Sequence, residues 1–211
     1  MMTMQEIQLS ATDSNWRLFM LRKADTAFLT FQKKIHIRDQ FTCQYCGFCA
    51  YQQLEVINQD GNYRNNRAAN LVTACNLCAQ CFFLESIGKG DFGGGTLIYL
   101  PEMSQRQLNA MCHVLFASMV LGGALAMPAR NVYRSFKLRT QIVEKQLGEG
   151  FSNPALLGRL MVDANKESAS TLHKEWLFKL RLLPEISRFT ANIEANMIAS
   201  LRELTFVFNH D

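Results

Sequence analysis

The chain has 211 residues, of which 48% are hydrophobic and 19% are charged. This composition is typical of a globular protein and excludes global disorder, and the length allows a core that needs no disulfide bonds. The 22 Lys and Arg residues against 18 Asp and Glu give a net charge of +4, which is too mild to indicate a nucleic-acid-binding protein by itself.

Cysteine is unusually frequent, and six of the seven cysteines lie between residues 43 and 81. Residues 1–10 contain no sustained apolar region, so we expect no signal peptide and a cytoplasmic chain with reduced thiols. The longest apolar run, residues 114–127, is shorter than the roughly 20 residues of a membrane span. We therefore expect a metal site rather than disulfides, and a buried helix over 114–127.

The first 100 residues predict mixed structure. Residues 16–21 are typical of a strand, and residues 27–38 of a helix with its apolar side chains at helical spacing. Residues 54–56 and 96–100 are predicted to be strands, and the glycine-rich residues 88–95 to be a flexible connection.

Residues from 101 onward predict mostly helices. Ser104 with Gln107 fits a capping box, Gly122-Gly123 should end that helix, and Pro128 suits the first turn of the next, which should reach about residue 147. Asn153-Pro154 predicts a further start, with an end near residue 168. Residues 172–183 and 185–204 should be helical, with a break at Pro184. We expect regions 1–100 and 101–211 to pack as one compact unit.

The segment 130–145 carries five basic residues against Glu144 alone. It is interpreted first as a solvated helix face whose apolar side faces the core, and two alternatives stay open: a surface for an acidic protein or lipid, and a nucleic-acid surface. The residues expected on the apolar side are Val132, Phe136, Leu138 and Val143.

Two C-x2-C pairs carry the clearest chemical signal. They are Cys43 with Cys46 and Cys75 with Cys78. Four thiolates form a closed tetrahedral zinc site with no open position for substrate, so we predict one structural Zn2+. Cys49 and Cys81 extend both pairs, which leaves an iron–sulfur cluster, spare thiols or exchange of Cys49 for Cys46 as alternatives. Cys112, in an apolar helix, is expected in the core.

Residues around the cysteines resemble an HNH endonuclease module. The similar segments are residues 38–47, 54–56 and 70–78, and the match covers about residues 35–85. The resemblance implies an α+β fold: an HNH-like ββα-metal (treble-clef) zinc module followed by a mostly α-helical C-terminal half.

The catalytic positions of that family are changed in this sequence. Ile57 and Asn58 stand where the family has Asp-His, and neither accepts a proton near neutral pH. Ala79 stands near the last motif residue, His36 lies on the wrong element to replace the base, and Asn70 suits a structural turn. We therefore predict a protein that is not an enzyme.

Over its whole length the chain resembles a family of zinc proteins from the coupling complex of Dot/Icm type IVB secretion systems. The resemblance rests on the degenerate module, the helical second half and residues 180–184. It implies a cytoplasmic adaptor at the inner membrane that binds the segment after the ATPase domain of the membrane coupling ATPase, together with other coupling-complex subunits, and supports effector export. It implies no small-molecule substrate and only indirect membrane contact. The alternative is a nucleic-acid-binding protein or divergent nuclease that keeps the zinc frame.

Overall fold

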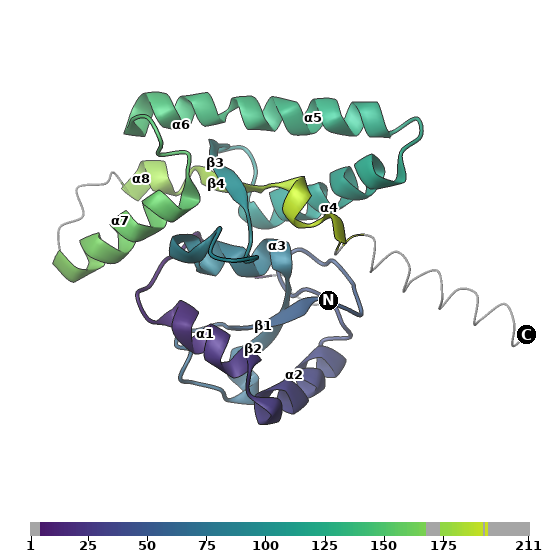
Figure 1. Cartoon of the computed structure of the whole chain (residues 1–211), viewed down its shortest axis with the longest axis vertical. Helices are drawn as coiled ribbons and strands as arrows, with labels where there is room; N and C mark the ends of the chain where they lie inside the picture. The colour runs from purple at the N-terminus through teal and green to yellow at the C-terminus, as the bar shows by residue number, and fades with distance from the viewer. Residues whose placement is uncertain (1–4, 168–173, 192, 194–211) are drawn as a thin grey trace, which may run out of the picture.

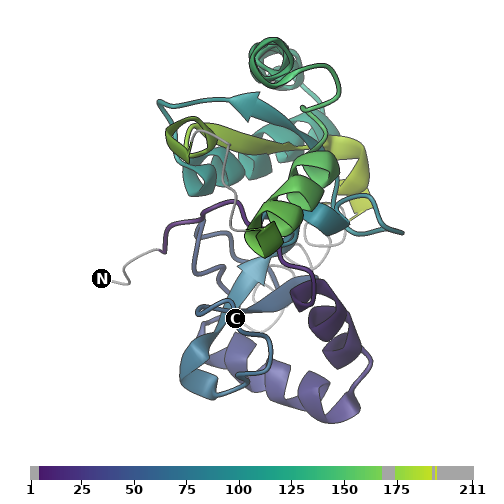
Figure 2. The same ribbon diagram turned by 90° about the vertical axis from the view of Figure 1, so that its left-hand side faces the viewer.

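The structure, a computed structural model, describes residues 5–167, 174–191 and 193. These residues combine helices with two small antiparallel sheets. One end of the molecule in Figure 1 holds α1 (Asn15–Lys23), α2 (Thr26–Arg38), β1 (Leu54–Asn58) and β2 (Leu71–Cys75), and the other holds α5 (Ala126–Leu138) and α6 (Thr140–Leu147). Between them lie β3 (Gly95–Tyr99), β4 (Leu180–Pro184) and α4 (Gln105–Leu121), and Figure 2 shows the same order.

Helix α1 replaces the strand expected over residues 16–21, so that prediction is wrong. Its buried side chains, Phe19 and Arg22, are three residues apart, which is helical spacing. A short apolar run fits a strand or a buried helix equally well, and contacts distant in sequence decide between them. Here the Phe19 ring packs against the rings of Tyr63 and Phe83.

Helix α2 lies where the sequence predicts it. Asp25 caps its start, because a carboxylate oxygen accepts hydrogen bonds from the N–H groups of residues 27 and 28. Phe28 and Ile35 on its buried side pack with Val56 and Leu71 of the β1–β2 sheet. This packing holds the sheet, and with it the end of β2, in place.

Strands β1 and β2 pair antiparallel, with Leu54 opposite Cys75 and Asn58 opposite Leu71. The strand predicted over residues 54–56 is thus confirmed. Helix α3 (Asn76–Ala79) follows β2 directly, and a 3-10 turn over residues 80–82 continues it. The resulting order of strand, strand and short helix places Cys75 and Cys78 one helical turn apart.

Helix α4 starts at the predicted capping box, in which Ser104 and Gln107 each accept a hydrogen bond from the other's backbone N–H. It ends before Gly122, whose φ of 76° interrupts the helix. The predicted buried helix over residues 114–127 is therefore divided by a turn. Val114, Leu121 and Met127 are exposed, so burial of these three side chains was wrongly predicted.

The predicted helix from Pro128 to about residue 147 is present as two pieces, α5 and α6, that meet at Arg139. Phe136 packs against the core and Val143 is buried, as expected. Val132 and Leu138 are 40% and 64% exposed instead. Leu138 lies about 200° around the helix from Phe136, because each residue turns a helix by about 100°.

Helix α7 (Pro154–Glu167) begins at the predicted Asn153-Pro154 pair, where the Asn153 side chain accepts a hydrogen bond from the backbone of residue 155. It packs closely on the turn over residues 84–86: a Cβ at Gly158 would lie 2.3 Å from the backbone N of Glu85. The predicted end near residue 168 falls outside the described residues.

The C-terminal region corrects the prediction of a helix over residues 172–183. It holds the short helix α8 (Lys174–Leu177) and strand β4, which pairs antiparallel with β3. Leu180, Leu182 and Leu183 are all buried in this strand. Residues 186–188 form a 3-10 turn, and most of the helix predicted over 185–204 lies outside the described residues.

The β3–β4 pair and one apolar core connect the two predicted regions. The strand expected over residues 96–100 is confirmed as β3, although its partner β4 comes from beyond residue 100. Phe83, Leu97, Phe116 and Leu182 belong to the same buried cluster. The boundary between 1–100 and 101–211 stays a prediction. Within the described part of the chain, no helix has the length and apolar character needed to cross a membrane.

Candidate metal centre

The two cysteine pairs come from a turn and from the β2–α3 junction. Gly47, with a φ of 78°, closes the first turn by donating its N–H to the Cys43 carbonyl at 3.0 Å. Cys75 ends β2, and Cys78 lies in α3. The backbone N–H of Gln44 donates to the carbonyl of Thr73 at 2.9 Å, which fixes the turn beside β2.

The four predicted ligands, Cys43, Cys46, Cys75 and Cys78, lie together, and their Sγ atoms are all within 4.8 Å of one another. The Sγ atoms of Cys46 and Cys75 are 3.6 Å apart. Tetrahedral zinc with Zn–S bonds of about 2.3 Å places neighbouring sulfurs about 3.8 Å apart. A disulfide would need about 2.05 Å. The four sulfurs could thus hold a metal ion.

The burial of this cluster opposes ionisation of its thiols. Cys43, Cys75 and Cys78 are buried, and Cys46 is partly exposed. Burial raises the pKa of Cys75 and of Cys78, whereas hydrogen bonding, first of all with Cys43, lowers the pKa of Cys46. Four neighbouring thiolates would repel one another, so a bound cation is the group that allows all four to ionise.

Helix α4 contributes two polar side chains beside the sulfurs. Asn109 donates from Nδ2 to the Sγ of Cys78 at 3.3 Å and to the carbonyl of Leu77 at 3.2 Å. The Nε2 of His113 lies 3.2 Å from the Sγ of Cys75, and its ring stacks on Phe48 with centroids 3.7 Å apart. In the tautomer with hydrogen on Nε2, His113 donates to that sulfur. Donors of this kind orient metal-binding side chains.

A buried hydrogen-bond chain continues from Asn109 to β4. Gln105 donates from Nε2 to the Oδ1 of Asn109 at 2.9 Å and to the carbonyl of Leu182 at 2.8 Å. Its Oε1 accepts from the N–H of Leu182 at 2.8 Å. Gln105, Asn109 and His113 were not identified from the sequence. The available signal was their spacing, because polar residues four apart lie on one side of a helix.

The other cysteines lie outside the group of four. Cys81 and Cys112 are fully buried, and burial raises the pKa of each thiol to about 12. These two thiols therefore behave as small core residues. Cys49 is exposed, and its Sγ is 3.9 Å from the carbonyl oxygen of Gln40, so it matches the spare-thiol interpretation.

Asn58, which the resemblance aligns with the catalytic histidine of the HNH family, is buried. Its Oδ1 accepts a hydrogen bond from Arg22 Nη1 at 2.5 Å, and its Nδ2 donates to the carbonyls of Asn62 and Asn65 at 3.0 and 2.8 Å. The neighbouring Ile57 is fully buried. The amide is thus occupied on both sides by protein groups.

Arg22 fills the space beside Asn58 and was not identified from the sequence. Its guanidinium also donates to the carbonyl of Val56 and lies 4.7 and 4.8 Å from the ring centroids of Phe28 and Tyr63. Burial lowers the pKa of Arg22 to about 10, so the group stays charged at neutral pH. A paired, stacked arginine of this kind stabilises the fold.

The remaining positions of the resemblance have structural surroundings. Asn70 donates to the Asp60 carboxylate at 2.9 Å and accepts from its N–H at 3.1 Å, which closes the loop between β1 and β2. Ala79 is fully buried. His36 is buried, and its Nδ1 lies 3.0 Å from the Thr73 hydroxyl.

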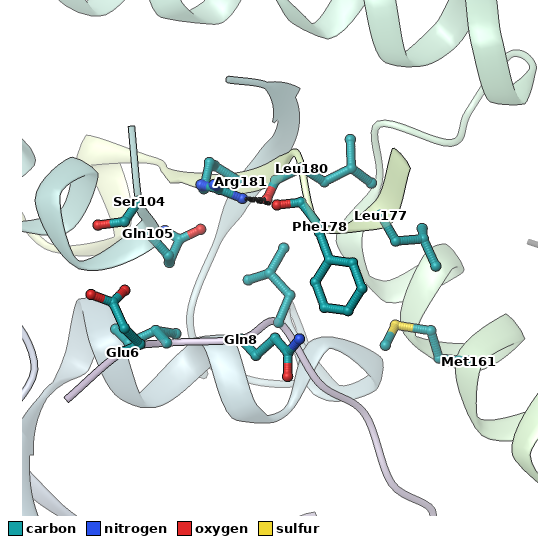
Figure 3. A pocket seen from close by; sticks show the side chains of 11 residues that line it. Glu6, Gln8, Ser104, Gln105, Met161, Leu177, Phe178, Leu180 and Arg181 are labelled. Carbon is teal, nitrogen blue, oxygen red and sulfur yellow. Dashed lines mark hydrogen bonds between the residues drawn. The ribbon is translucent and has the colours of Figure 1, made fainter. Parts of the chain in front are cut away.

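A separate cleft of about 310 Å³ lies between the N-terminal segment, the start of α4, α7 and the α8–β4 connection (Figure 3). Arg181 lines it, but its guanidinium donates to the carbonyls of Met103, Phe178 and Leu180 at 2.6 Å each. Glu6 pairs with Arg106. The lining contains no histidine or cysteine.

Comparison with known proteins identifies a relative of nearly full length. No protein-family model matches this chain. A curated protein from Legionella pneumophila subsp. pneumophila (strain Philadelphia 1) is 49% identical over 200 residues, which cover 94% of this chain and 92% of the relative. That relative is named type 4 apparatus protein DotN.

Proposed function

This chain belongs to the DotN (IcmJ) family of type 4 apparatus proteins, and from this we propose that it is a non-enzymatic adaptor subunit of a type IVB secretion system. Its partner is the segment after the ATPase domain of the membrane coupling ATPase, together with other subunits of the coupling complex. Through that partner it works at the cytoplasmic face of the inner membrane and supports effector recruitment and export.

The surroundings of Asn58 carry the proposal. A nuclease of the HNH class needs a base at this position that can reach water. Here the Asn58 amide is buried and hydrogen-bonded to Arg22, Asn62 and Asn65. Its neighbour Ile57 offers no metal ligand. These contacts support the proposal that this module keeps its fold but lacks the catalytic groups of a nuclease. Binding is then the remaining role of the protein.

We further propose that Cys43, Cys46, Cys75 and Cys78 hold one structural zinc ion and that residues 1–100 form an HNH-like module. The close approach of the four sulfur atoms supports this ligand set. Zinc would neutralise the thiolates and join the turn at residues 43–47 to the β2–α3 junction. Asn109 and His113 would then orient Cys78 and Cys75 from α4.

A calorimetric titration tests the adaptor function. A synthetic peptide that covers the segment after the ATPase domain of the coupling ATPase from the same organism is added to the purified chain, with thermal melting in parallel. We expect binding in the micromolar range or tighter and a higher melting temperature, because a ligand that binds only the folded chain stabilises it. No binding at tens of micromolar peptide, with the metal retained, would reject the adaptor.

The nuclease alternative is tested on the same preparation. We expect no cleavage of DNA or RNA with magnesium, manganese or nickel, and no gel retardation that persists when the salt concentration is raised. The double variant Ile57→Asp/Asn58→His should also be inactive, because its histidine loses the Arg22 contact and Ala79 still offers no ligand. Cleavage by the wild-type chain that persists in Asn58→Ala would contradict the non-enzymatic assignment.

A further inference from the structure

Helices α5 and α6 present one stripe of side chains to the protein and another to solvent. The inner stripe includes Ala126, Ala129 and Val143, which are buried, and Tyr133, whose hydroxyl donates to the Pro184 carbonyl at 2.9 Å. The two helices run end to end along the end of the molecule opposite β1 and β2 (Figure 1). Their inner contacts are therefore made by the protein itself, and the outer stripe is open.

The outer stripe combines large apolar side chains with basic ones at helical spacing. Met127, Leu138 and Ile142 are 55%, 64% and 41% exposed. Arg130, Arg134 and Lys137 are exposed beside them. These six residues define the α5–α6 face. Steps of three or four residues place them along one side of the helices, and with Lys145 the stripe extends over about 27 Å at 1.5 Å per residue.

The charge of this face is not balanced within the described chain. Glu144 is the single acidic residue between 126 and 147, and its carboxylate accepts hydrogen bonds from the N–H groups of Gly150 and Ser152. Arg139 pairs with Glu102. Among the residues that the structure describes, none forms an ion pair with Arg130, Arg134 or Lys137.

We propose that the α5–α6 face binds an acidic amphipathic helix of a partner protein. A straight stripe with apolar positions three and four residues apart from basic ones matches the side of a second helix, whose apolar side chains would pack on Leu138 and Ile142. Carboxylates flanking that apolar side would meet Arg130, Arg134 and Lys137. The proposal rests on the adaptor function only for the choice of the first peptide tested.

The composition of the face favours a protein helix over a membrane or nucleic acid. Helices that lie in a membrane surface place aromatic or bulky apolar residues along a broad side, whereas Tyr133 and Phe136 here point to the core and Asn131 interrupts the outer stripe. A nucleic-acid surface gains nothing from exposed Met127 and Leu138, because phosphates contact charges and polar groups.

Two peptides and two matched variants test the proposal. The first peptide is the coupling-ATPase segment, and the second is a designed 18-residue amphipathic helix rich in glutamate and leucine. The test variant is Arg130→Glu/Arg134→Glu/Lys137→Glu. The control variant, Lys33→Glu/Lys34→Glu/Arg64→Glu, makes the same charge change with three exposed residues of α2 and of the loop between β1 and β2. Both variants are checked for unchanged melting temperature and metal content.

We expect the test variant to bind at least about tenfold more weakly, and the control variant to stay within about twofold of the wild type. Leu138→Ser/Ile142→Ser, which keeps all charges, should also weaken binding. If the first peptide binds all variants equally, the adaptor function is supported, and the assignment of the α5–α6 face as the binding site is wrong. If only the designed helix binds, and binds the test variant more weakly, the α5–α6 face is supported as a binding site for acidic helices. The coupling-ATPase segment is then not the partner.

Two further results would overturn the proposal. One is equal weakening in the test and control variants, which would indicate net charge rather than a surface. The other is binding of phosphatidylglycerol vesicles or duplex DNA that the test variant abolishes, with neither peptide binding the wild type. Either result would assign the face to a different ligand or to none.

Discussion

Arg22 and Arg134 have the same side chain at opposite ends of the molecule and entirely different surroundings. Arg22 is buried over aromatic rings and donates hydrogen bonds to Asn58 and to the Val56 carbonyl. Arg134 is exposed on α5 and forms no ion pair with a described residue. The first arginine holds elements together, and the second leaves its charge available to a partner.

The same contrast holds for the two regions as a whole. Around the four cysteines and Arg22, sulfur, amide and guanidinium groups are buried and joined by hydrogen bonds. Removing one group therefore leaves others without a hydrogen-bond partner. At the α5–α6 face, polar groups meet water and can be changed at little cost to folding. Substitutions at the first end should therefore act on stability, and those at the second on binding.

The largest effect is expected for Cys78→Ser. Loss of one ligand should release the metal and destabilise the fold by more than about 4 kcal/mol, because metal binding contributes directly to folding. Cys49→Ser, which changes an exposed thiol outside the cluster, should retain the metal and the wild-type melting temperature. Metal analysis and thermal melting measure both. If the Cys78→Ser chain folds normally without metal, metal binding does not contribute to the stability of the fold.

Arg22→Met should have the next largest effect, about 3 kcal/mol of lost stability, because Asn58 and the Val56 carbonyl keep their burial and lose their donor. The matched variant Arg134→Met should stay within about 0.5 kcal/mol of the wild type. Urea unfolding measures the two. An equal loss of stability in both variants would mean that the buried and the exposed arginine contribute equally to folding.

Asn109→Leu tests the link between α4 and the cysteines. We expect a loss of about 2 kcal/mol, since Gln105 and Cys78 each lose a hydrogen-bond partner in a buried site. Metal should also transfer to a chelator about tenfold faster, because a group that orients a ligand is missing. Asn131→Leu on the exposed side of α5 is the control and should change neither. Unchanged metal release in Asn109→Leu would limit its role to packing.

The smallest effect on stability is expected for the triple reversal Arg130→Glu/Arg134→Glu/Lys137→Glu. Its free energy of unfolding should stay within about 0.5 kcal/mol of the wild type, because exposed charges contribute little to folding. It should nevertheless bind an acidic helix at least about tenfold more weakly. A strong loss of stability in urea would mean that these residues serve the fold, and the two ends would no longer differ.

Features set by neighbouring residues could be predicted from the sequence. The two C-x2-C pairs, the capping box at Ser104 and the Asn153-Pro154 helix start each depend on residues within a few positions of one another. The structure places the four cysteines together, begins α4 and α7 at the predicted points and ends α4 before Gly122.

Features set by distant contacts could not be predicted. Residues 180–184 are rich in leucine and fit a helix, but their pairing with β3, some 85 residues earlier in the sequence, makes them a strand. Arg22 gains its role from Asn58, 36 positions away, and Asn109 from Cys78, 31 positions away. A single sequence gives no signal for contacts of this range unless the residue types themselves suggest a pair, as cysteines do.

The metal content of the purified chain is the decisive measurement for the four-cysteine site. The protein is prepared without added metal and measured by elemental analysis and by X-ray absorption at the zinc edge. We expect one zinc per chain, bound by four sulfur atoms at about 2.3 Å. Iron with the visible absorbance of a cluster, or a fully folded chain without metal, would contradict this expectation.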